Sequence, residues 1–104
     1  MSFSLEQTFK DMLEAAKGVF AEEWPMVKDD MKRVLDDEKE ALKETAEARL
    51  RDEIDDEELE EQLKDEKEAF QAGLSMVQAS TKATIQRAID AASEVFWNAV
   101  KAAI

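Results

Sequence analysis

The sequence of 104 residues contains no cysteine and no histidine. Without cysteine the chain has no disulfides, thiolate metal sites or cysteine nucleophiles. Without histidine it lacks the commonest general base and the commonest ligand of transition metals. The remaining residues show no nucleophile–base pair, phosphate loop or oxyanion arrangement. We therefore expect a protein that is not an enzyme and that uses no cofactor and no metal ion.

Helix-breaking residues and long apolar runs are also scarce. With only two glycines and one proline, and with abundant Ala, Glu, Lys and Leu, the composition predicts helix almost throughout. No apolar run approaches the ~18 residues of a membrane span. The opening residues MSFSLEQTFKDML lack a basic region followed by an apolar run, so the sequence predicts no secretory signal. The expected compartment is the cytoplasm.

Basic residues are outnumbered, with 14 Lys and Arg against 26 Asp and Glu, for a net charge of −12. Residues 29–68 hold 19 acids and 8 bases, whereas both ends of the chain are nearly neutral. A chain of this charge is repelled by phosphate backbones, so direct binding to nucleic acid is not expected.

The first half carries one apolar stripe at helical spacing, from Leu5 to Ala46, with a gap at Glu38. The stripe keeps its phase through Pro25. We therefore favour one long helix kinked at Pro25 over a break with Pro25 as the first residue of a new helix. Glu38 is the single acid on the inward face, and we expect a frayed or water-filled point there rather than a carboxylate site.

The second half repeats its apolar residues every eleven positions, at Leu63, Leu74, Ile85 and Phe96. Eleven residues over three turns is close to the natural helical period, so this pattern predicts a nearly straight rod. Gly73 lies within it, and nothing beside it indicates a break. We expect Gly73 to be a point of close packing or flexibility.

Between the halves lies the acidic segment RDEIDDEELEEQ, residues 51–62. Asp55 with Glu58 matches an acidic capping box, and Ser4 with Gln7 matches another at the start of the chain. The sequence therefore predicts an all-α single domain, residues 1–104: a long antiparallel two-helix hairpin, coiled-coil-like, with helices of about 4–52 and 55–104 and a turn at 52–55. Each helix would be on the order of 70–75 Å long, with both termini at the end opposite the turn.

The apolar face near the termini is wider than one partner helix requires, and such a surface usually marks an interface. The primary functional hypothesis is a self-associating scaffold or assembly subunit, forming a dimer or larger oligomer, closed or filamentous. The predicted oligomer interface consists of Phe3, Val19, Met26, Ile89, Phe96, Trp97, Val100 and Ile104.

Two alternatives remain open. The acidic tip could make the chain an adaptor or inhibitor of a basic protein, or a nucleic-acid mimic; its residues are Asp52, Glu53, Asp55, Asp56, Glu57 and Glu58. The amphipathic segment 83–104 could instead lie on a membrane surface, although its polar face has balanced charges rather than the usual excess of Lys and Arg. A calcium loop at the turn is not expected, because Glu57 stands where such a loop needs glycine.

Overall fold

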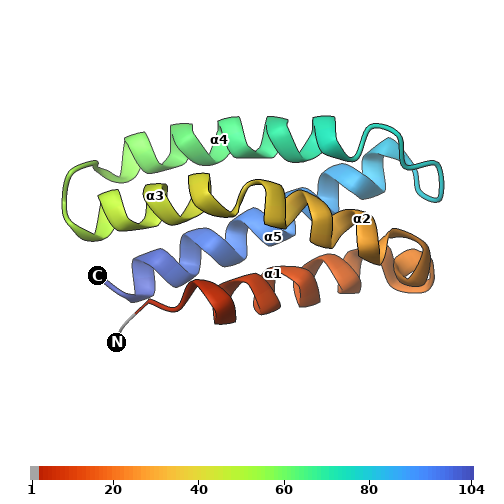
Figure 1. Cartoon of the computed structure of the whole chain (residues 1–104), viewed down its shortest axis with the longest axis horizontal. Helices are drawn as coiled ribbons and strands as arrows, with labels where there is room; N and C mark the ends of the chain where they lie inside the picture. Colours follow the sequence, from red (N-terminus) through yellow and green to blue (C-terminus); the bar gives the residue numbers. More distant parts are fainter. Residues whose placement is uncertain (1–2) are drawn as a thin grey trace.

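The computed structural model describes residues 3–104, and every regular element in that part of the chain is helical. The elements are α1 (Leu5–Phe20), the short 3-10 helix η1 (Ala21–Glu23), α2 (Trp24–Asp37), α3 (Lys39–Leu50), α4 (Asp56–Gly73) and α5 (Lys82–Ala102). Helices α2 and α3 form one bent rod, so the chain runs up and down in four passes (Figure 1). This is an antiparallel four-helix bundle. The all-α prediction is confirmed.

The long two-helix hairpin is not what the structure shows. The bundle measures 40 × 23 × 19 Å, which is too short for helices on the order of 70–75 Å. Each predicted helix reverses direction once, at residues 21–23 and at 74–81, and the first is also interrupted at Glu38. The turn at 51–55 lies at the same end of the bundle as the start of α1 and the end of α5, not at the opposite end (Figure 1).

The predicted pairing of the two halves nevertheless persists. The Thr45 hydroxyl donates to Gln62 Oε1 at 2.8 Å, and the Arg33 guanidinium donates to the Gly73 carbonyl at 3.2 Å. In each contact the two residues are about equally far along the chain from residue 54, on opposite sides of it. This is the pairing expected of a hairpin that turns near residue 54. The fold is therefore such a hairpin folded back on itself. The part near its turn (α2, α3 and α4) packs against the part near the termini (α1 and α5), and each part covers the apolar face of the other.

The first break begins at Ala21, whose φ of 51° is unusual for a residue other than glycine. The Ala21 N–H still donates to the Lys17 carbonyl and so ends α1. Pro25 then lies in the first turn of α2, where its missing N–H costs no helical hydrogen bond. The kinked-helix prediction is wrong here, and the alternative of a new helix starting beside Pro25 is the observed one.

The second break follows Gly73, where the sequence predicts a continuous helix. Helix α4 ends at Gly73, and α5 starts only after Thr81, whose hydroxyl accepts from the Thr84 N–H at 3.2 Å. Capping by threonine is the local signal for this start. The eleven-residue period hides the break in the sequence, because apolar residues before and after the loop both face the core and so continue the pattern.

The turn between the predicted halves is confirmed. Asp52, with φ 61°, ends α3, and the Glu53 N–H donates to the Ala48 carbonyl at 2.8 Å, as in a Schellman motif. The Asp55 carboxylate caps α4 by accepting from the Glu58 N–H at 2.9 Å. The predicted cap at Ser4 is also present, accepting from the Gln7 N–H at 3.3 Å.

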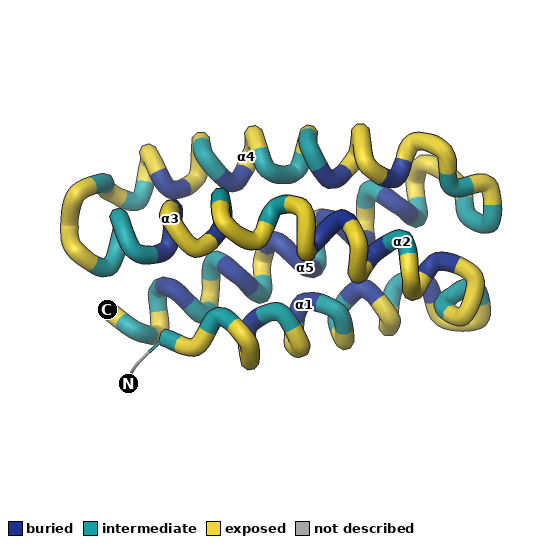
Figure 2. The backbone as a smooth tube through the Cα atoms, viewed as in Figure 1, coloured by how far each residue is buried: buried dark blue, intermediate teal, exposed yellow. Residues whose placement is uncertain are grey.

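The predicted stripes supply most of the core. Buried positions face the inside of the bundle in all four passes, and exposed positions face outward (Figure 2). From the first stripe Met31 and Leu42 are fully enclosed, and all four members of the eleven-residue series are buried. The largest fully buried side chains are Phe70, Phe96, Met12, Met31, Leu35, Leu42, Leu59, Leu74, Ile89, Val27 and Val100.

The two glycines have opposite roles, and alanine substitution should separate them. A Cβ at Gly73 would lie 2.8 Å from Cγ2 of the buried, β-branched Val34, so Gly73→Ala is expected to destabilise the bundle by about 1 kcal/mol. A Cβ at Gly18 meets nothing within 4 Å, so Gly18→Ala should stabilise by about 0.5–1 kcal/mol. Thermal unfolding of both variants tests this. A Gly73→Ala protein as stable as the wild type would mean that α4 does not pack this closely on α2.

Candidate interaction surface

The predicted oligomer interface is divided between the core and two ends of the bundle. Ile89, Phe96 and Val100 have no exposed surface, because the other helices of the same chain cover them. The structure thus corrects their assignment to a subunit contact. Phe3, Val19 and Trp97 are partly buried against this core.

The two interface residues that stay exposed do not form one patch. Met26 is 62% exposed and Ile104 61% exposed. Met26 lies at the start of α2, at the far end of the bundle from Ile104 (Figure 1). The only other large apolar side chain exposed in residues 3–104 is Met76, in the loop after α4. The broad apolar face expected near the termini is therefore largely internal.

The predicted acidic tip lies in the turn and the first turn of α4, and its six carboxylates do not have equal surroundings. Asp56 joins three helices, with its Oδ1 2.9 Å from Nε of Arg49 on α3 and its Oδ2 paired with Nζ of Lys101 on α5. Hydrogen bonds from Lys101 and Arg49 lower the pKa of Asp56. Asp56 is thus a structural ion-pair residue rather than a free binding group.

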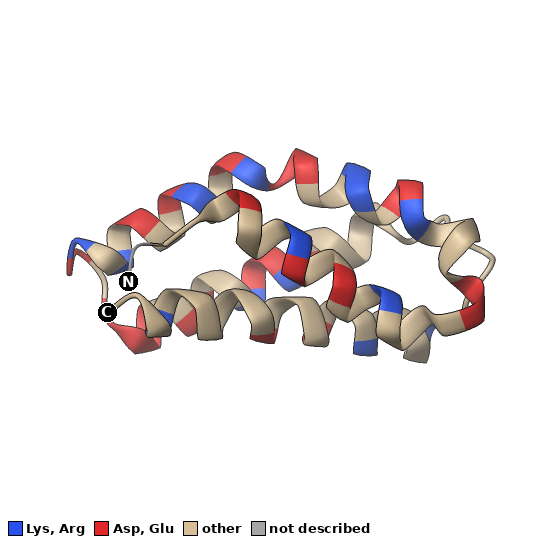
Figure 3. Ribbon diagram, turned by 90° about the horizontal axis from the view of Figure 1, so that it is seen from below, with Lys and Arg blue, Asp and Glu red and all other residues tan. Residues whose placement is uncertain are grey.

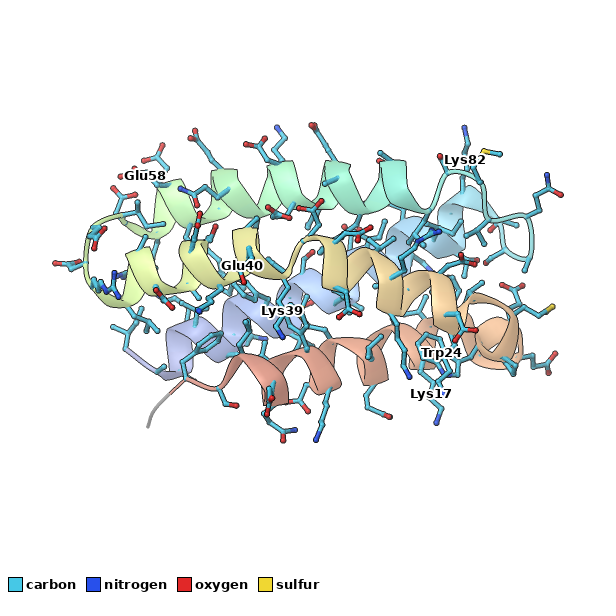
Figure 4. The ribbon with its side chains drawn as sticks, viewed as in Figure 1. Lys17, Trp24, Lys39, Glu40, Glu58 and Lys82 are labelled. Atoms are coloured by element: carbon cyan, nitrogen blue, oxygen red, sulfur yellow. The ribbon has the colours of Figure 1, made fainter. Side chains whose placement is uncertain are left out.

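The other tip carboxylates are less constrained. Asp52 and Glu53 make only long contacts, to Arg49 at 3.6 Å and to Arg51 at 3.9 Å. Asp55 is used as the cap of α4. Glu57 and Glu58 are exposed and have no cationic partner within 4.0 Å in the described part of the chain. Glu58 lies on the outer side of the bundle at the start of α4 (Figure 4).

Helix α4 is where the negative charge is concentrated, with 8 acids and 2 bases in its 18 residues. We define the acidic stripe as Glu57, Glu61, Asp65 and Glu68, which are exposed and spaced so that they follow one side of the helix. No cation of residues 3–104 lies within ion-pairing distance of any of the four. Lys64 lies on the same side of α4 and also makes no ion pair.

In the other α-helices acids and bases are more nearly equal in number, although most of the acids there also make no ion pair within residues 3–104. Acidic and basic positions alternate along several ribbons in Figure 3, while other stretches are uncharged. Glu47 pairs with Arg51, four residues later, at 3.4 Å, and Asp30 pairs with Arg33 at 3.5 Å. Glu60 and Lys64 have the same spacing on α4 but form no ion pair with each other. The charges of α4 are therefore less neutralised than the spacing of its residues suggests.

A second carboxylate feature joins α4 to the bent rod. Glu38 lies at the joint between α2 and α3, and its side chain is within hydrogen-bonding reach of Glu66. Partial burial, a hydrogen bond that the protonated Glu66 carboxyl donates to Glu38, and repulsion by Glu38 and Asp65 raise the pKa of Glu66 to about 7. The Oε2 atom of Glu66 is buried without a hydrogen-bond partner in residues 3–104. Glu38 is the one residue between α2 and α3, so the expected frayed point is present as an interruption of the helix, and the Glu66 carboxyl lies near it.

These features define a small acidic four-helix bundle in which the negative charge is concentrated on α4. No group of three or more acidic side chains within the described residues is arranged to hold a metal ion. None of the described helices is both long and apolar enough to cross a membrane. Comparisons with protein-family models, with curated proteins and with solved structures each returned no match.

Proposed function

We propose that this chain is a non-enzymatic binding protein that recognises a basic protein partner through the acidic stripe of α4. The observation that carries the proposal is the excess of acids on α4, 8 against 2 bases, with no ion pair made within residues 3–104 by any of the four stripe carboxylates. Glu57–Glu61 and Glu61–Asp65 are like-charged neighbours four residues apart, each disfavouring the helix by about 0.2–0.5 kcal/mol. This arrangement does not help α4 to fold, but a cationic partner would relieve the repulsion.

The geometry of the stripe suits an extended or helical basic segment. From Glu57 to Glu68 it covers on the order of 16 Å along α4, a rigid element whose inner face is held by the buried Leu59, Leu63 and Phe70. Carboxylates on a rigid, exposed helix attract cations over long range and raise the rate of association. A basic nucleic-acid-binding protein is one kind of partner with the required charge.

The other two hypotheses receive less support. Self-association was expected from a broad apolar surface, and three of the eight residues assigned to it are enclosed within one chain. A membrane-surface role would use the apolar face of residues 83–104. In the bundle that face contributes Ile85, Ile89 and Phe96 to the core, so it would have to be released first.

Charge-neutral substitution of the stripe tests the proposed function. The quadruple variant Glu57→Gln, Glu61→Gln, Asp65→Asn, Glu68→Gln is expected to bind an octalysine peptide at least about tenfold more weakly than the wild type. Isothermal titration calorimetry would measure this at about 0.02 M salt, where surface charges are weakly screened. Raising the salt to about 0.15 M should weaken wild-type binding as well.

The matched control is Glu6→Gln, Asp11→Asn, Glu14→Gln, Glu22→Gln, which removes the same charge from exposed positions on α1 and η1. This control should lose less than about threefold in affinity, because only the long-range field changes. Equal losses in both variants would show that net charge alone attracts the peptide, and the proposal would fail. Affinity capture with the same three proteins would then identify a cellular partner that salt releases and that the stripe variant does not retain.

A further inference from the structure

A groove of about 630 Å³ lies between α4 and α5, next to the acidic stripe but lined by none of its four residues. Two ion pairs join the helices, one beyond the groove and one within its lining. One joins Asp56 to Lys101, and the other joins Lys67 to Asp90 at 3.3 Å. Between these two connections the helices are bridged by no ion pair of residues 3–104. The groove therefore extends along α4 and α5 from the Lys67–Asp90 pair toward the Asp56–Lys101 pair.

The groove contains a polar group that the protein leaves unpartnered. Ser93 lines it, is only 3% exposed, and its Oγ has no hydrogen-bond partner among the described residues. A serine inside a helix commonly donates to the carbonyl four residues earlier, which here belongs to Ile89. The Ser93 hydroxyl does not, although a buried hydroxyl without a partner is unfavourable. The Oγ atom is covered, so a bound molecule would donate a hydrogen bond to it after a small shift of the side chains that line the groove.

The surroundings of Ser93 combine an apolar wall with free carboxylates. Leu63 of α4 and the half-buried indole of Trp97 on α5 supply apolar surface. Glu60 and Glu94 also line the groove, and neither has a cationic partner within 4.0 Å in the described chain. Because Lys67 pairs with Asp90 across the antiparallel helices, Glu60 lies at about the level of Trp97.

We propose that this groove binds a small amphipathic organic cation with a planar apolar body. The ring would pack against Trp97 and Leu63, a ring N–H would donate to Ser93 Oγ, and the ammonium group would face Glu60 and Glu94. The net charge of −12 raises the local concentration of cations, whereas an anion would have only Lys64 as an unpaired cation in the groove. This site does not rest on the proposed function, because it uses none of the stripe residues.

Three indole compounds of different charge provide the test, by NMR titration of the ¹⁵N-labelled protein. We expect tryptamine, a cation, to shift the Trp97 indole and Ser93 amide signals saturably. Its affinity should exceed that of neutral indole at least about threefold, and the anion indole-3-acetate should bind most weakly. No saturable shift with tryptamine, or indole-3-acetate binding as tightly as tryptamine, would overturn the proposal. So would shifts centred on Trp24, which lies at the other end of the bundle (Figure 4).

Variants separate the parts of the site. Ser93→Ala removes an unpartnered hydroxyl, so the bundle should stay folded while tryptamine binding weakens several-fold. The double variant Glu60→Gln, Glu94→Gln should reduce tryptamine to the affinity of indole. Trp24→Phe is the matched aromatic control and should leave binding unchanged. Unchanged tryptamine affinity in both the Ser93 variant and the double carboxylate variant, with the fold verified by circular dichroism, would rule this site out.

Discussion

Phe96→Ala is expected to lower the free energy of unfolding by about 3–5 kcal/mol, among the largest stability effects of a single truncation in this bundle. Phe96 has no exposed surface, and its ring packs edge-to-face on Phe3 with centroids 6.2 Å apart. Removing the ring loses transfer free energy and leaves a cavity between α1 and α5. Urea unfolding followed by circular dichroism would measure the change, because the stability falls linearly with denaturant.

The same substitution distinguishes a core position from a subunit interface. If Phe96 belonged to an oligomer contact, its replacement would change the molecular mass in solution more than the stability of each chain. We expect the opposite, with a wild-type mass of 11.8 kDa in native mass measurement. Met76→Ala is the control, since Met76 is 84% exposed and its loss should change stability by no more than about 0.5 kcal/mol. A change of molecular mass on Phe96→Ala, with little loss of chain stability, would contradict the placement of Phe96 in the core of one chain.

The second large effect is a loss of stability as pH rises through neutrality, caused by Glu66. Its pKa is about 7 in the folded chain, compared with an ordinary value of 4.5. The folded state therefore keeps this proton where the unfolded state has lost it. The stabilising contribution is complete below about pH 4.5 and is lost as pH rises through about 7. After allowance for solvent screening of a partly exposed carboxyl, we expect a loss of about 1–2 kcal/mol.

Glu66→Gln should abolish this dependence, because the amide mimics the protonated carboxyl at every pH. The variant should match the wild type at pH 5 and exceed it by about 1–2 kcal/mol at pH 8, in urea unfolding at the two pH values. Glu68→Gln, a neighbour of the same charge that is exposed on α4, is the control for net charge. A wild-type stability that stayed flat from pH 5 to pH 8 would show that folding does not raise the pKa of Glu66.

Asp56 acts in the opposite direction and in a different range. Its pKa is lowered from an ordinary value of 3.8 by the hydrogen bonds from Lys101 and Arg49. Its contribution is therefore present above that value and is lost as pH falls through the lowered pKa. The two groups can be distinguished in one pH series, because Glu66 destabilises the fold toward alkaline pH and Asp56 toward acid.

The features predicted successfully are those that a few neighbouring residues determine. The caps at Ser4 and Asp55 and the turn at Asp52 depend on side chains reaching backbone groups within one helical turn. The inward-facing positions followed from the helical period, and residues such as Leu42 and Leu74 are indeed buried. Local chemistry and periodicity thus predicted the all-α class and the members of the core.

The candidate surface was only partly predictable. The acidic turn could be located from its composition, but the distinction between Asp56 and its neighbours could not, because Lys101 reaches it from the end of the chain. Glu38 was recognisable as an acid on an inward face. Its partner Glu66 becomes visible only when α4 is placed against the bent rod at a known register.

The sequence by itself determined that the chain is helical, where its midpoint turns, and which side of each helix faces inward. Only the tertiary structure decided that the chain reverses direction at residues 21–23 and 74–81, and that the broad apolar face is covered by the same chain. Helical periodicity indicates which residues are buried. It does not indicate whether they are buried by another helix of the same chain or by another molecule. Burial within one chain brings the covering surface close without the entropic cost of association between molecules, and this favours the bundle over a long, partly exposed hairpin.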